Sequence, residues 1–400
     1  MRPPAVSWEN VMSDKRIPYG RQDISDEDVA AVVQALRSDF LTQGPEVPRF
    51  EKIVADYCGA DHAIAVNSAT SALHIACLAL GLGPGDLLWT TPITFVASAN
   101  CARYCGADVD FVDINPVTCN LSPVALAEKL AAAKKAGKLP KVLVAVHLSG
   151  EPCDMQALAA LCAEYGVKII EDASHAIGGR YGSGRIGNCA HSAVTIFSFH
   201  PVKIVTSAEG GMAMTNDAEL AEAMNLLRSH GITRDPAKMQ SEPHGGWYYE
   251  QIALGFNYRM TDIHAALGTS QMRRLNQFME RRHELANRYD QLLAGFPVVT
   301  PHRNRENYSG LHLYVIRVPM RAGKPDRDTV FVRLQQAGIG VNLHYIPVHL
   351  QPYYRDNGQA NKSYPHAEAY YREAITLPLY PGLSNADQDR VVTALREALA

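Results

Sequence analysis

Short apolar runs alternate with helix-like segments between residues 61 and 215, and this alternation is the strongest constraint on the fold. The apolar runs lie at residues 62–66, 86–90, 108–112, 141–146, 168–170, 193–197 and 211–214. Helix-like segments follow several of them, at residues 70–80, 94–104, 123–135 and 155–165. Such alternation predicts an α/β domain with a mainly parallel sheet flanked by helices on both faces. Ligands of these folds bind at the carboxyl ends of the strands.

The last third of the chain predicts a second, smaller unit. Its expected elements, in chain order, are a helix at 261–293, a strand at 312–318, a helix at 327–336, a strand at 341–345 and a helix after Ser384. We therefore expect a loose tail at 1–15, a large domain at 16–255, and a linking helix with a small α+β domain at 256–400. Residues 235–255 are rich in Gly, Pro and Tyr, which predicts a long functional loop.

The composition is that of an ordinary globular protein. Of the 400 residues 47% are hydrophobic, and a formal net charge of −3 gives no basic field to attract nucleic acid. The eight cysteines show no CxxC spacing, so we expect free, mostly buried thiols in a reducing compartment. No signal-peptide core opens the chain, and no uncharged apolar stretch is long enough to cross a bilayer. We expect a cytoplasmic protein that binds neither nucleic acid nor membrane.

An acid and a lysine follow two of the apolar runs. Asp172 comes at the end of one run, and Lys203 lies shortly after Ser198, where the next run ends. The sequence neighbours of Lys203 are apolar, and desolvation lowers the pKa of an ammonium group, as an imine-forming amine requires. A carboxylate one strand back would keep a pyridine nitrogen protonated, so the pair predicts pyridoxal phosphate (PLP) held as a Schiff base.

The plainer alternatives are a solvated surface lysine and a helix-capping aspartate. Glu171 competes for the carboxylate role, but strand alternation aims it the opposite way.

The residues that follow two of the predicted strands could bind a phosphate, and a phenylalanine after a third could stack on a ring. The segment NSATSA, at residues 67–72, enters a helix, where small residues, free amide groups and the hydroxyls of Thr70 and Ser71 favour a phosphate. An ordinary N-cap is the alternative. Ser198 adds a hydroxyl at another strand end. Phe95 could stack on a planar ring, although a buried phenylalanine usually belongs to the core.

Two further features are ambiguous or misleading. His175 could reach a hydroxyl on the ring or could equally satisfy a backbone carbonyl. Residues 182–187 match the dinucleotide pattern GxGxxG, but they lead into a strand and do not open a helix. A glycine-rich hairpin turn is therefore expected there.

Five motifs occur in order along the chain, namely NSATSAL, EDASHA, SFHPVK, AEGG and GFNYRMTDI. In this combination the chain resembles the DegT–StrS family of PLP-dependent nucleotide-sugar aminotransferases, from residue 17 to its carboxyl terminus. The resemblance implies fold type I of the PLP-dependent transferases, the aspartate-aminotransferase fold. It also implies a homodimer whose active sites lie at the subunit interface.

The resemblance implies a role for each matching residue. Lys203 would hold the cofactor and shuttle the proton, and Asp172 would pair with the pyridine nitrogen. His175, where many relatives have glutamine, would face the ring hydroxyl, and Phe95 would stack on the ring. The phosphate contacts would be Thr70, Ser71, Ser198 and, from the partner subunit, Asn257.

Segments outside the cofactor site narrow the resemblance. IPYGRQ, SDFLTQGP, NCARYCGADVDFVDI and LRSHGITRDP resemble the branch of the family that acts in pseudaminic acid biosynthesis. This implies transfer of the amino group of L-glutamate to C4 of a UDP-4-keto-6-deoxy-N-acetylhexosamine, in pseudaminic acid or related surface-sugar biosynthesis. One departure is Ala208, where a glycine is expected before Glu209. The candidate substrate contacts are Tyr19, Arg228, His344 and His349.

Two other functions fit part of the pattern. A PLP-dependent 4-keto-sugar 3-dehydratase would share the scaffold, but such relatives have histidine in place of the lysine, and Lys203 is intact. A non-catalytic PLP-binding regulator would hold the cofactor without reacting with an amino acid. No metal is expected, because His344 and His349 have no carboxylate beside them in the sequence.

Overall fold

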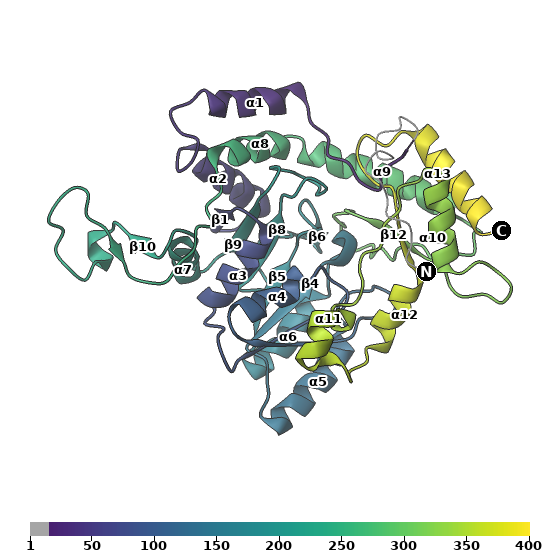
Figure 1. The fold of residues 1–400 in the computed structure, drawn as a ribbon, viewed down its shortest axis with the longest axis horizontal. Helices are drawn as coiled ribbons and strands as arrows, with labels where there is room; N and C mark the ends of the chain where they lie inside the picture. Colours follow the sequence, from purple (N-terminus) through teal and green to yellow (C-terminus); the bar gives the residue numbers. More distant parts are fainter. Residues whose placement is uncertain (1–15) are drawn as a thin grey trace.

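A seven-stranded sheet forms the centre of the computed structural model, which describes residues 16–400 (Figure 1). Its strand order is β1-β9-β8-β5-β4-β2-β3. The strands are β1 (His62–Val66), β2 (Leu87–Thr90), β3 (Asp108–Phe111), β4 (Val142–Val146), β5 (Lys168–Asp172), β8 (Val194–Ser198) and β9 (Gly211–Thr215). The pairs from β3 to β8 are parallel, and β9 is antiparallel to both of its neighbours. The predicted mainly parallel sheet is confirmed. The expected tail at 1–15 lies outside the described residues.

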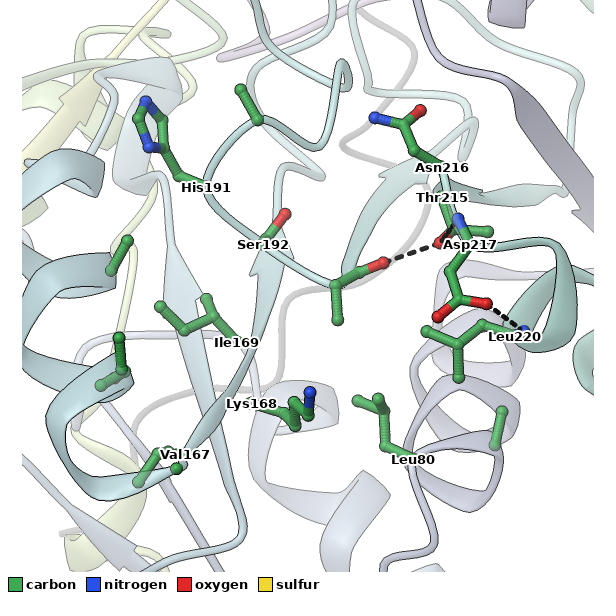
Figure 2. Close-up of a pocket in the computed structure, with 17 residues that line it drawn as sticks. Leu80, Val167, Lys168, Ile169, His191, Ser192, Thr215, Asn216, Asp217 and Leu220 are labelled. Atoms are coloured by element: carbon green, nitrogen blue, oxygen red, sulfur yellow. Dashed lines mark hydrogen bonds between the residues drawn. The ribbon is translucent and has the colours of Figure 1, made fainter.

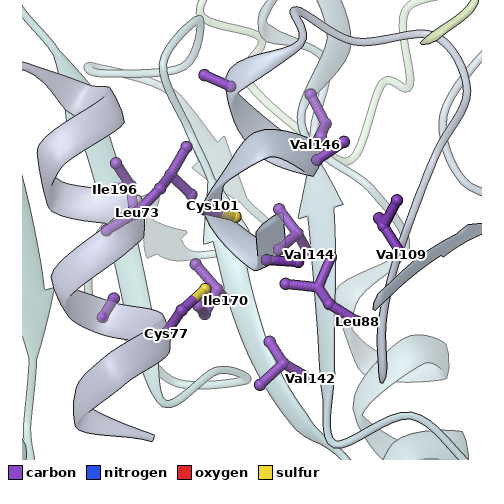
Figure 3. Packing of buried hydrophobic residues seen from close by; sticks show 14 of the residues in the cluster. Leu73, Cys77, Leu88, Cys101, Val109, Val142, Val144, Val146, Ile170 and Ile196 are labelled. Atoms are coloured by element: carbon purple, nitrogen blue, oxygen red, sulfur yellow. The ribbon is translucent and has the colours of Figure 1, made fainter. Parts of the chain in front are cut away.

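Helices cover both faces of this sheet because successive residues of each strand point to opposite sides. Val142 and Val144 of β4 pack with α3 (Ala69–Ala79) and α4 (Ala97–Tyr104), as Figure 3 shows. Leu143 packs in another cluster with residues of α5 (Pro123–Ala136) and α6 (Met155–Tyr165). The crossover helices therefore bury a sheet that is apolar on both sides. A further helix, α7 (Ala218–Arg228), follows β9.

The smaller unit is built on two antiparallel strands, β12 (Tyr314–Arg317) and β13 (Ala374–Leu377). The prediction of a strand at 341–345 is wrong: that segment makes one isolated bridge, between Asn342 and Thr376, and the partner of β12 is β13. The other elements of the last third are α10 (Arg327–Gln336), α11 (Pro352–Tyr354), α12 (Pro365–Glu373) and α13 (Asn385–Ala398). Ile17 bridges Ile339, so the start of the described chain lies with this unit.

The predicted helix at 261–293 is two helices, α8 (Asp262–Met272) and α9 (Leu275–Leu292), interrupted at Arg273 and Arg274. Two amino-terminal helices pack on α8, namely α1 (Asp26–Leu36) and α2 (Glu46–Cys58). None of the helices in the described range 16–400 has the length and apolarity needed to span a membrane.

Two short hairpins lie outside the large sheet. The expected glycine-rich turn is confirmed as a hairpin of β6 (Arg180–Tyr181) and β7 (Gly184–Arg185). The predicted loop at 235–255 belongs to an arm that projects from the large unit in Figure 1, with β10 (Ile232–Thr233) and β11 (Glu250–Gln251) paired at its base. All eight cysteines are free thiols, and seven of them are buried.

Candidate active site

A cavity of about 370 Å³ lies between the large sheet and the smaller unit, at the carboxyl ends of β4, β5 and β8. This is the position expected for a ligand of a parallel sheet. The residues predicted from the sequence that line it are Tyr19, Thr70, Phe95, Asp172, His175, Ser198, Lys203 and His344. The structure thus brings together side chains that are up to 325 positions apart in the chain.

Lys203 projects from a closed loop that follows β8. The backbone N–H of Phe199 donates to the carbonyl of Gly210, and the N–H of Ser207 donates to the carbonyl of Phe199. These bonds fix both ends of the loop around Lys203. Burial lowers the pKa of Lys203 to about 8, and the negative charge of Asp172 opposes part of that shift. At pH 7 about a tenth of such amines is neutral, against well under a thousandth of ordinary lysines.

Asp172 and Glu171 point to opposite sides of β5, as strand alternation requires. Asp172 lines the cavity, and its Oδ1 accepts from the backbone N–H of Ser174 at 3.1 Å. Glu171 accepts hydrogen bonds from His147 Nε2 at 2.9 Å and from the Ser192 hydroxyl at 2.6 Å, away from the cavity. Asp172 is therefore the carboxylate that faces Lys203.

The amino-terminal end of α3 forms one wall of the cavity, with Thr70 in the lining. The first turn of a helix has amide N–H groups without carbonyl partners within the helix, and the helix dipole favours an anion there. Ser71 turns elsewhere, because its hydroxyl donates to Asn67 Oδ1 at 2.6 Å. A Cβ on Gly211 would lie 2.4 Å from the backbone nitrogen of Ala69, so glycine is required where β9 passes beneath this end.

Four histidines line the cavity: His200 is exposed, and the other three, His175, His312 and His344, are buried. Burial, and next the charge of Lys203, lower the pKa of His344 to about 3. Burial likewise holds the pKa values of His175 and His312 well below the ordinary value, with smaller contributions from nearby positive charges. All three imidazoles are therefore neutral at physiological pH, and they add no charge that would compete with Lys203 for Asp172.

Both ring nitrogens of His175 have partners in the protein. The N–H of Ser149 donates to Nδ1 at 3.3 Å, and Nε2 lies 3.1 Å from the Tyr345 hydroxyl. A neutral imidazole that accepts at Nδ1 has its proton on Nε2, so His175 donates to Tyr345. The hydroxyl proton of Tyr345 then remains available to a group in the cavity. The rings of Tyr345 and Phe95 have their centroids 6.2 Å apart.

Two predicted substrate residues, Arg228 and His349, and two predicted cofactor contacts, Ser71 and Asn257, lie outside the lining. Arg228 pairs with Glu51 at 2.5 Å and donates to the carbonyl of Ala65. His349 is buried with Nε2 3.3 Å from Glu368 Oε1. Asn257 is exposed beside the base of the arm and bridges Ser229. Asn257 was expected to act on a partner's site, and its exposure is compatible with that prediction.

Several lining residues were not predicted. His312 and Asn342 reach the cavity from the smaller unit, and the Tyr19 hydroxyl pairs with the Asn342 side chain. Ser98 lies one layer behind and donates to Asp172 at 2.6 Å. The sequence did offer a signal for Ser98. Its hydroxyl lies four residues after Thr94, one helical turn on, and close to Phe95, the residue predicted to stack on the ring.

Ala208 has φ of +65°, in the left-handed region that favours glycine. This is the position where the family pattern led us to expect glycine. The adjacent Glu209 lines the cavity, so the departure from the pattern affects the backbone that positions an active-site side chain.

A second, larger cavity of about 890 Å³ lies at the opposite end of the sheet, near the start of β5 (Figure 2). Two of its polar side chains serve the local backbone: Asp217 accepts from the N–H groups of Glu219 and Leu220 and caps α7, and Thr215 donates to a backbone carbonyl. The side chains that could take part in catalysis, Lys203, Asp172 and His175 among them, lie in the smaller cavity.

The chain matches the model of the DegT/DnrJ/EryC1/StrS aminotransferase family over residues 22–396. Among curated proteins it is 38% identical over 384 residues to the spore coat polysaccharide biosynthesis protein SpsC of Bacillus subtilis, covering 95% of this chain and 96% of that one.

Solved structures give the same assignment. Helicobacter pylori PseC, an aminotransferase involved in the biosynthesis of pseudoaminic acid, superposes with a TM-score of 0.88 at 29% identity, covering 96% of this chain and 99% of PseC. A Streptococcus pneumoniae protein described as a sugar aminotransferase, in its PMP form, gives a TM-score of 0.86 at 31% identity, covering 96% and 98%. The same protein has also been solved in a PLP form.

The cavity fits this cofactor. It places an amine with a lowered pKa opposite an oriented carboxylate, and it has a helix start for the phosphate with an aromatic ring at its mouth. Each chemical part of PLP therefore has a complementary group.

Proposed function

Because the chain belongs to the DegT/DnrJ/EryC1/StrS aminotransferase family and is a PLP-dependent sugar aminotransferase, we propose that it transfers the amino group of L-glutamate to C4 of a UDP-4-keto-6-deoxy-N-acetylhexosamine. The product would enter pseudaminic acid or related surface-sugar biosynthesis in the cytoplasm. The observation that supports this most is the joint placement of Lys203 and Asp172 in one cavity that the smaller unit closes. The similarity to PseC supports the choice of sugar.

The cofactor, when bound, supplies the electron sink that makes the Cα proton of an amino acid acidic. Lys203 Nζ removes that proton as a neutral amine, and returns a proton to C4 of the sugar in the second half of the reaction. A pKa near 8 suits both directions, because the group must accept and release a proton near neutral pH. Asp172 would hold the ring nitrogen of the bound cofactor in its protonated form.

The remaining walls position the reactants. The α3 amino terminus, with Thr70 and Ser198, would hold the phosphate, and Phe95 in the same lining would stack on the ring. Asn257 from a partner subunit completes the phosphate contacts in a homodimer with shared sites. Tyr19 and His344, whose rings lie 5.5 Å apart in the lining, would contact the sugar, and the Tyr345 hydroxyl would donate to one of its oxygens.

The direct test supplies purified protein, PLP, ¹⁵N-labelled L-glutamate and individual UDP-4-keto-6-deoxy-N-acetylhexosamines, and analyses the products by mass spectrometry and NMR. We expect ¹⁵N at C4 of the sugar and formation of 2-oxoglutarate. Reaction with L-glutamate but with none of the UDP-sugars would overturn the sugar assignment. Loss of the C3 oxygen without glutamate would identify a 3-dehydratase, and cofactor binding without any half-reaction would identify a regulator.

A matched pair of lysine variants controls this assay. Lys203→Ala should abolish label transfer, whereas Lys168→Ala, at an exposed position that lines the other cavity, should retain activity within about twofold. An active Lys203→Ala variant would contradict the assignment of the amine.

A further inference from the structure

Asp172 is held by a chain of two buried hydroxyls that reaches it from the element after β2. The hydroxyl of Ser98 donates to Asp172 Oδ2 at 2.6 Å, and Thr94 Oγ1 lies 2.7 Å from Ser98 Oγ. Thr94 is 2% exposed and Ser98 is fully buried. Water therefore does not compete for either bond.

The direction of the chain follows from counting donors. The Asp172 carboxylate can only accept, so the single Ser98 proton is used on Oδ2. The contact between Thr94 and Ser98 must then be a donation from Thr94 to the Ser98 oxygen. This donation polarises the Ser98 hydroxyl and strengthens its bond to the carboxylate.

The contact is not the ordinary bond of a helical serine. A serine within a helix commonly donates to the carbonyl of the residue four positions earlier. Ser98, near the start of α4, instead bonds a side chain 74 residues away on β5. The Ser98 side chain of α4 holds one carboxylate oxygen of Asp172, and the backbone N–H of Ser174, just after β5, holds the other.

We propose that Ser98, oriented by Thr94, is a positioning residue that holds Asp172 as a fixed carboxylate against the ring nitrogen of the cofactor. This rests on the assignment of Asp172 to that nitrogen under the proposed function. A carboxylate has lone pairs for about four donors, so two bonds from the protein leave room for the ring N–H. Loss of Ser98 would leave the Asp172 carboxylate with one bond fewer and less ordered, so it would hold the ring N–H, and with it the positive charge of the ring, less well.

The test measures the pH midpoint of the visible absorbance of the holoenzyme, which reports the charge on the cofactor ring independently of turnover. In Ser98→Ala we expect the midpoint to rise by about half a pH unit or more, because a less positive ring withdraws fewer electrons from the Lys203 nitrogen. The single-turnover rate with L-glutamate should fall about tenfold. Thr94→Val should shift both values in the same direction by a smaller amount.

Two conservative variants separate this role from general packing. Thr94→Ser retains the donating hydroxyl and should restore the native midpoint. Thr90→Val removes a buried hydroxyl that bonds the carbonyl of Val144 on the same sheet, and it should leave the midpoint unchanged. If Ser98→Ala does not bind the cofactor, the midpoints of Thr94→Val and Thr94→Ser are compared instead. Both variants keep Ser98, and a shift in Thr94→Val alone would support the positioning role.

Asp172→Asn distinguishes failure of this proposal from failure of its premise. A midpoint that moves in Asp172→Asn but stays native in Ser98→Ala and Thr94→Val would overturn the positioning role alone. A midpoint that stays native in Asp172→Asn would overturn the pairing of Asp172 with the ring nitrogen, and the role of Ser98 with it.

Discussion

Lys203 owes its reactivity to its surroundings rather than to its residue type. Burial in the apolar loop and the cavity disfavours the ammonium form and lowers the pKa of Lys203, and the negative charge of Asp172 stabilises the ammonium form and opposes part of that change. The sequence indicated both effects, because the neighbours of Lys203 are apolar and an acid ends the preceding strand. The size of the shift needed the folded cavity.

The first prediction concerns the titration of this amine. In the protein freed of cofactor, acetylation of Lys203 across pH should follow a midpoint near 8, measured by competitive labelling and mass spectrometry against free Nα-acetyl-lysine. Removal of the Asp172 charge in Asp172→Asn should lower the midpoint, because that charge is what raises the pKa. A midpoint equal to that of free lysine would contradict the burial described here.

The second prediction concerns Ala208. Replacement of Ala208 by glycine should raise the free energy of unfolding by about 0.5–1 kcal/mol, because its φ of +65° is unfavourable for a residue with a Cβ. Thermal unfolding of the cofactor-free protein measures the change. The control is Ala131→Gly, in the middle of the exposed face of α5, which should destabilise by about 1 kcal/mol. Destabilisation by both variants would show that Ala208 is not strained.

At the scale of elements, one buried carboxylate of α1 bonds residues at the junction of α8 and α9. Asp28 forms the capping box with Ser25 and accepts hydrogen bonds from Gln271 at 2.6 Å and Arg274 at 2.5 Å. Burial alone would raise the pKa of Asp28, but these hydrogen bonds and the Arg274 charge outweigh it and lower the pKa.

The third prediction follows from this lowered pKa. The stabilisation from Asp28 is present above the unfolded pKa of an aspartate, about 4, and is lost as the pH falls through the lower folded value. Asp28→Asn should cost about 2–3 kcal/mol at pH 7, and its stability should fall less steeply than the native stability below pH 4. Asp26→Asn, exposed in the same turn, should change stability by a few tenths of a kcal/mol. Equal losses in the two variants would contradict the assigned role of Asp28.

Elements with local signals were predictable from the sequence, and elements that depend on distant partners were not. The helices α6 and α10 match their predicted ranges, because each begins at a capping aspartate, Asp154 or Asp326. The strand expected at 341–345 is irregular, since the segment that pairs with β12 comes some thirty residues later, as β13. The break between α8 and α9 falls at two arginines, which give no helix-ending signal.

At the scale of the whole molecule, the active site is made by folding the smaller unit over the strand ends of the large one. The strand-end residues Lys203 and Asp172 could be predicted, because a parallel sheet collects its ligands there. His312 and Asn342 could not, since their place in the cavity depends on how the two units pack. Arg228 was a reasonable candidate by residue type, but its ion pair with Glu51 became visible only in the fold.

The fourth prediction tests the proposal that two subunits share each site. Lys203→Ala and Asn257→Ala should each be nearly inactive alone, but mixed subunits should regain activity. In a random mixture half of the dimers are mixed and each has one intact site, so about a quarter of the native activity is expected. The same two variants, refolded separately and then combined without exchange, serve as the control. No recovery after exchange would place Asn257 outside the partner's site.

The bond between Lys203 Nζ and the cofactor aldehyde is tested most directly by borohydride reduction of the holoenzyme, followed by proteolysis and mass spectrometry. Reduction makes the linkage permanent, so the modified peptide identifies the amine. The account predicts one pyridoxyl group per chain, on Lys203. A pyridoxyl group on any other lysine, or on none, would contradict it.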